Sequence, residues 1–159
     1  MTLVLVLTIA MAILLSVAPL KAAERRAPAV AVDHHVHIHS PAILAILPDY
    51  CASPGRATPC DPEFSNPLTA SDLLLAMDKA GIRRARVMST AYLAESPMMV
   101  PPAPDHVAIV RKANDFTVAL AREHRGRLEA YIGVNPLTAT ALWEIDRWHG
   151  DRNVASVFT

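Results

Sequence analysis

The sequence has no excess of charge of either sign, since its 159 residues include 15 Lys or Arg and 15 Asp or Glu. Proteins that bind nucleic acid or an anionic surface usually carry a basic excess, so we expect neither partner. Glycines number only five and aromatic residues make up only 5%. Prolines, by contrast, number 13 and predict irregular loops between the regular elements. The length suits a single domain.

The amino terminus lacks the basic residue that usually opens a signal peptide, although the rest of that pattern is there. An apolar run from Leu3 to Val17 is followed by a proline, a lysine and the small pair Ala22-Ala23. This order predicts a signal peptide over residues 1–23 and export to the periplasm or the outside. The alternative is an uncleaved membrane anchor over residues 3–20, which nearly spans a bilayer.

Cysteine is also scarce. Only Cys51 and Cys60 are present, in a segment that also contains proline, glycine and serine. Their spacing does not suggest a metal site. In an exported protein the two thiols can form a small local disulfide, and otherwise they are two free thiols without a role.

Histidines, in contrast, are concentrated in one short segment, Val32 to His39. If this segment is a β-strand, its side chains alternate between two faces. One face then holds Asp33, His35, His37 and His39, and the other packs His34 and apolar residues against helices. Two imidazoles two residues apart can reach one metal ion, and imidazole suits zinc and related divalent metals. His35 and His37 are therefore a candidate metal clip; a histidine-rich surface strand and adventitious metal binding are the alternatives.

The remaining elements follow the alternation of strands and helices that is typical of a parallel sheet. Ser40-Pro41 predicts a helix start, and Pro48 predicts its end. Thr69 and Asp72 predict a capping box, with Gly81 just past the helix end. In chain order, the sequence predicts a strand over 32–39, a helix over 42–47, a loop over 50–68, a helix over 70–80, a strand over 85–89, a loop over 90–104, a helix over 105–123, a strand over 128–134, a helix after Thr138 and a strand over 154–158.

The histidine segment resembles the first barrel strand of the amidohydrolase superfamily, specifically its amidohydrolase-related group. That strand reads roughly Ile-Asp-x-His-x-His-hydrophobic, and here the residues are Val32 to Ile38. The resemblance continues over residues 70–82, 86–90 and 126–136. It implies an α/β fold, namely the N-terminal portion of a (β/α)8 TIM-type barrel over residues 30–159. It also implies metal-dependent hydrolysis or decarboxylation of a small carboxylate, lactone or amide through a metal-activated water.

The resemblance further implies roles for the residues of this strand. His35 and His37 would be two ligands of a divalent metal, with zinc expected. Asp33 would brace the strand or accept a hydrogen bond from a histidine. His39 either contacts substrate or lies exposed in a loop, and we expect the exposed loop.

Two polar residues stand at the ends of the next predicted strands. Thr90 follows the second strand and Asn135 follows the third. Barrel enzymes collect substrate contacts at this rim, so both are candidates for contact with a small-molecule substrate. Ordinary capping of the strand ends is the alternative.

A (β/α)8 barrel needs eight strands and at least about 200 residues. The sequence predicts three βα units and part of a fourth strand. The resemblance places the remaining ligands on later strands: further histidines, and an aspartate that helps to activate the metal-bound water. We expect a truncated hydrolase, and the alternatives are a fragment, two chains that pair into one barrel, and a different fold. A non-catalytic exported metal-binding protein is the alternative function, and self-association would cover the open sheet in either case.

Overall fold

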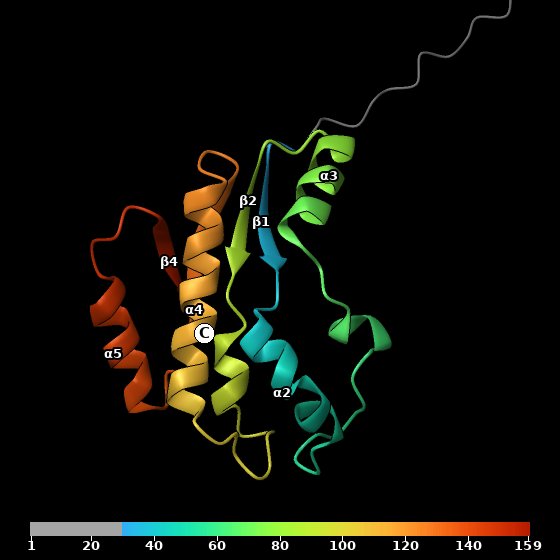
Figure 1. The fold of residues 1–159 in the computed structure, drawn as a ribbon, viewed down its shortest axis with the longest axis vertical. Helices are drawn as coiled ribbons and strands as arrows, with labels where there is room; N and C mark the ends of the chain where they lie inside the picture. The colour runs from blue at the N-terminus through green and yellow to red at the C-terminus, as the bar shows by residue number, and fades with distance from the viewer. Residues whose placement is uncertain (1–29) are drawn as a thin grey trace, which may run out of the picture.

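The computed structural model of the protein describes residues 30–159, and the predicted signal peptide or anchor lies outside this range (Figure 1). Within residues 30–159 no helix is both long and apolar enough to cross a bilayer. The strands are β1 (Val32–His37), β2 (Arg84–Met88), β3 (Leu128–Gly133) and β4 (Val154–Phe158). The helices are α2 (Pro41–Ala52), α3 (Ala70–Ala80), α4 (His106–Glu123) and α5 (Ala139–Trp148), with short 3-10 turns η1 (Pro62–Ser65) and η2 (Ala91–Glu95).

The four strands form one parallel sheet in the order β1-β2-β3-β4, so each strand lies beside the next one in the chain. Helices α3, α4 and α5 pack against the same face of this sheet. Leu73 and Met77 of α3 contact the buried side of β1 and β2, while Val118 and Ala121 of α4 contact β3. The opposite side of the sheet, which we call the open face, carries the histidines. Figure 1 shows β1 and β2 running toward α2, which stands at their carboxyl ends.

A bulge in β1 changes the faces that the sequence pattern predicted. Asp33 pairs with Ala85, and Val36 pairs with Val87. Between these two pairs β1 contains one residue more than β2. The extra residue places both His34 and His35 on the open face. The prediction that His34 packs against the helices is therefore wrong. His34 is exposed, and its Nδ1 atom accepts a hydrogen bond of 2.8 Å from Arg86.

Helix α2 begins as predicted but does not end at Pro48. The Ser40 hydroxyl accepts a hydrogen bond from the Ile43 amide, and Pro41 takes the first helical position. Pro48 removes one amide from the helix, yet the helix continues to Ala52. The reason is tertiary packing, because buried side chains on both sides of Pro48, Leu47 and Tyr50 among them, join one apolar cluster.

Helix α3 has the predicted ends. The Thr69 hydroxyl accepts from the Asp72 amide, and the Asp72 carboxylate accepts from the Thr69 amide, which completes the capping box. Gly81 follows the helix with a φ of 73°, a left-handed conformation that glycine adopts without steric cost.

A buried polar network ties α4 and α5 to the end of β3. The Asn114 side chain is fully buried, and it donates to the Gly133 carbonyl at 3.1 Å and accepts from the Gly133 amide at 2.8 Å. It also donates to the Glu144 carboxylate at 2.9 Å. Arg147 pairs with the same carboxylate, so the buried charge of Glu144 is compensated.

Replacing Asn114 with alanine is expected to lower the free energy of unfolding by about 3 kcal/mol, because three buried polar groups lose a partner. Urea unfolding monitored by circular dichroism measures this loss. Lys112→Ala, at an exposed position on the same helix, is the matched control and should stay within about 0.5 kcal/mol of the parent. Equal stability of the two variants would contradict a structural role for the network.

Candidate metal site

His35 and His37 lie in the second half of β1 and point their imidazoles toward one another on the open face. Their Nε2 atoms are 2.9 Å apart, and their rings meet edge to face at a centroid distance of 4.7 Å. Two nitrogens bound to one tetrahedral zinc lie about 3.3 Å apart. The separation of the two Nε2 atoms is therefore close to that of two ligands of one ion, and the pair of imidazoles suits a divalent metal.

The proton on His37 is placed by the neighbouring strand. The Nδ1 atom of His37 lies 3.0 Å from the carbonyl oxygen of Met88. A carbonyl can only accept, so Nδ1 carries the hydrogen and Nε2 presents its lone pair. A backbone carbonyl that fixes the ring in this way is typical of metal-binding histidines.

Burial favours the neutral, metal-binding form of the same ring. It lowers the pKa of His37 below its usual value, and the neighbouring His35 lowers it further, while the hydrogen bond to Met88 acts in the opposite direction. Because a metal competes with a proton for the imidazole, a lowered pKa helps binding at neutral pH.

His39 is not an exposed loop residue, so that expectation is wrong. It is half-buried, and both ring nitrogens are engaged. Nε2 donates to the Phe64 carbonyl at 3.0 Å, which leaves Nδ1 to accept from the Thr90 hydroxyl at 2.8 Å. Burial also lowers the pKa of His39. Thr90 thus orients His39, and neither side chain is left free to bind a metal in this arrangement.

The side chains of Asp33 and Asn135 both form hydrogen bonds with backbone groups. The Asp33 carboxylate accepts from the His35 amide at 3.0 Å, which braces the bulge beside the histidine pair. The Asn135 side chain donates to the Glu95 carbonyl at 2.7 Å and accepts from the Leu137 amide at 3.0 Å. Asn135 therefore links the end of β3 to η2.

Two aromatic residues next to the histidines were missed by the sequence analysis. The ring of Phe158, at the end of β4, lies 5.6 Å from His35 and 5.4 Å from His37, and Tyr92 lies 5.6 Å from Phe158. These rings give the histidine pair an apolar side. The position of Phe158 at the end of a strand was the available signal, because the carboxyl ends of parallel strands meet.

The histidine pair is half of a coordination sphere at most. Within residues 30–159 no group of three or more His, Cys, Asp or Glu side chains is arranged to hold a metal ion. The other positions would be filled by water or by groups outside this range.

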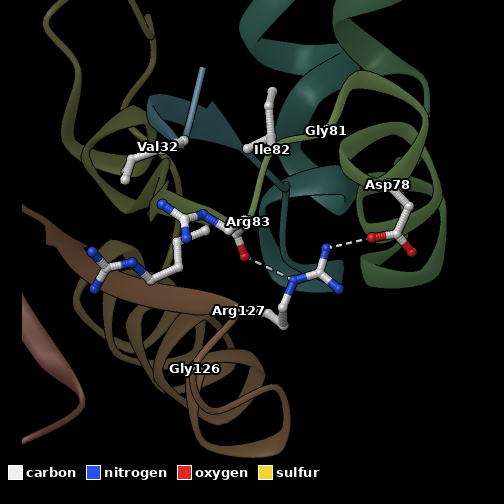
Figure 2. Close-up of a pocket in the computed structure, with 9 residues that line it drawn as sticks. Val32, Asp78, Gly81, Ile82, Arg83, Gly126 and Arg127 are labelled. Carbon is white, nitrogen blue, oxygen red and sulfur yellow. Dashed lines mark hydrogen bonds and ion pairs between the residues drawn. The ribbon is translucent and has the colours of Figure 1, made fainter. Parts of the chain in front are cut away.

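A pocket of about 690 Å³ lies at the amino-terminal end of the strands (Figure 2). Arg127 spans it, donating to the Arg83 carbonyl at 2.9 Å and pairing with Asp78 at 2.6 Å. These contacts join the turn before β3 to the end of α3 and to the residue before β2. The pocket is thus separated from the histidine pair by the length of the strands.

Comparison with known proteins finds no matching family model and no matching curated protein. Among solved structures, the fold is similar to 5-carboxyvanillate decarboxylase LigW from Sphingomonas paucimobilis, with a TM-score of 0.56 and 15% sequence identity. The similarity covers 76% of this chain and 39% of that one, so this chain spans less than half the length of the decarboxylase. The predicted fold class is confirmed: the described chain is an α/β protein whose four-stranded parallel sheet matches part of a (β/α)8 barrel.

Proposed function

We propose that this chain belongs to a metal-dependent hydrolase or decarboxylase of the type found in the amidohydrolase superfamily. The observation that carries the proposal is the convergence of two Nε2 atoms, from His35 and His37, on the open face of a partial barrel. The fold similarity to a decarboxylase supports the same class of chemistry. Bound there, a divalent ion would lower the pKa of a water molecule or polarise a substrate carbonyl.

The chain's own residues then have distinct tasks. His35 and His37 hold the ion, with the Met88 carbonyl keeping His37 in the ligating tautomer. Asp33 braces the strand beside the pair through its hydrogen bond from the His35 amide. Phe158 excludes water from one side of the pair, which strengthens electrostatic interactions at the site.

The proposed substrate class rests on the metal chemistry and on the name of the structural neighbour. We propose a small molecule with a carboxylate, lactone or amide group. An aromatic carboxylate is the first choice, because the neighbouring structure is that of a 5-carboxyvanillate decarboxylase.

The test is turnover by the full chain supplied with zinc or manganese. Release of carbon dioxide from 5-carboxyvanillate and hydrolysis of simple lactones and amides are followed in parallel. The double variant His35→Ala/His37→Ala is expected to lose at least about 100-fold in rate, because the ion loses both protein ligands. Metal binding without any turnover would instead favour a non-catalytic metal-binding protein, and turnover that persists in the double variant would refute the proposed site.

A further inference from the structure

A second pocket, independent of the histidine pair, lies between η2 and the start of α4. Its volume is about 370 Å³, and most of its lining is apolar, with Met99, Val100 and Pro102 among the residues that form it. Polar groups come from Glu95, His106 and Thr138. The pocket is large enough for a small organic molecule.

The Glu95 carboxylate in this pocket is buried and only half satisfied. The side chain is 2% exposed. Its Oε2 atom accepts from the Thr138 hydroxyl at 2.7 Å, whereas Oε1 is buried and has no hydrogen-bond partner among residues 30–159. The imidazole of His106 lies beside it, but its Nε2 atom is 3.8 Å from Oε1, beyond hydrogen-bond distance. A buried carboxylate oxygen without a donor is costly, so the position calls for a ligand that supplies one.

The surrounding structure holds Glu95 in place. The Asn135 side chain donates to its backbone carbonyl at 2.7 Å, and Thr138 holds the other carboxylate oxygen. His106 also lines the pocket, and its side chain is 46% exposed. A ligand can therefore reach Oε1 by displacing one exposed ring.

We propose that this pocket binds an organic ammonium ion, with the cation on Oε1 of Glu95 and an apolar body against Met99 and Val100. A charge-assisted hydrogen bond from an ammonium group supplies the missing donor. The apolar lining fits a hydrocarbon stem better than a hydrated metal ion, and within residues 30–159 no three metal-binding side chains are grouped here.

The probe for this site is benzylammonium, and benzyl alcohol serves as the uncharged molecule of the same shape. Binding is measured on the full chain by NMR chemical-shift titration. Saturable shifts are expected in residues 94–106 and in Thr138, with affinity in the millimolar range that suits so small a ligand. Benzyl alcohol should bind at least about tenfold more weakly, because it cannot form the ion pair.

The variant Glu95→Gln keeps the shape of the side chain and an oxygen for Thr138, and it should weaken benzylammonium binding at least about tenfold. Glu123→Gln removes an exposed carboxylate at the far end of α4 from His106, and it should leave the affinity unchanged. Equal binding of the two probes by the unmodified protein would overturn the proposal without any variant. So would shifts confined to the histidines of β1, or a Glu95→Gln variant that binds as the parent does.

Discussion

Replacing His37 with alanine should weaken zinc binding by at least about 100-fold, more than the 10- to 100-fold that is typical when only a residue orienting a ligand is lost. The reason is geometric. His37 supplies one of two converging Nε2 atoms, and it is the ring whose tautomer the Met88 carbonyl fixes. Competition with a chromogenic chelator measures the affinity, and His35→Ala should behave in the same way.

The matched control is His34→Ala. His34 is also exposed on the open face of β1, but its ring bonds to Arg86 rather than to the histidine pair. Its removal is expected to leave zinc affinity within about threefold, since no atom of His34 is needed to bring the two Nε2 atoms together. If His34→Ala weakened binding as much as His37→Ala does, the metal would be held adventitiously by a histidine-rich segment rather than by a built pair.

Replacing Gly133 with alanine should lower the free energy of unfolding by about 3 kcal/mol or more, as expected for overpacking against backbone. A Cβ atom at this position would lie 2.2 Å from the Ser89 carbonyl oxygen and 3.0 Å from its carbon. Backbone atoms cannot rotate away, so β2 and β3 would have to separate where their carboxyl ends meet. Urea unfolding of the variant measures the loss.

Gly150→Ala separates this clash from the conformational effect of removing a glycine. Gly150 has a φ of 79°, and an added Cβ there would meet no atom of residues 30–159 within 4 Å. Its replacement should therefore cost only about 1–2 kcal/mol, the penalty of a left-handed backbone for alanine. A Gly133→Ala variant no less stable than Gly150→Ala would mean that the two strand ends can move apart freely.

The regular elements were predictable because their signals are local. Thr69, Asp72 and Gly81 mark the ends of α3 through contacts within a few residues, and the structure has the predicted capping box. The parallel order of the sheet follows from the alternation of strands and helices.

The errors arose where a distant contact decides the outcome. Pro48 lies inside α2 because tertiary packing outweighs the lost hydrogen bond. The bulge that exposes His34 is a property of the pairing between β1 and β2, which a strict alternation cannot reveal. His39 is half-buried because its partner Phe64 comes from a segment that was predicted to be irregular.

At the site, the types and spacing of the histidines could be interpreted from the sequence. The side chains that surround them could not be predicted. The spacing of His35 and His37 indicated that two imidazoles could meet, whereas the aromatic side formed by Phe158 depends on β4 lying beside β3. The unsatisfied oxygen of Glu95 is equally invisible in the sequence, because it results from η2, α4 and α5 meeting in space.

The disulfide between Cys51 and Cys60 gives the neighbourhood of the histidines a sensitivity to redox conditions. Cys60 lies just before η1, whose Phe64 carbonyl accepts the hydrogen bond from His39. Reduction would release the link between this segment and the end of α2, and the entropy of the freed chain would then oppose that hydrogen bond. His39, two residues from His37, would then be held by Thr90 alone. A thiol reductant acting on this cross-link would therefore loosen the segment that follows the histidine pair.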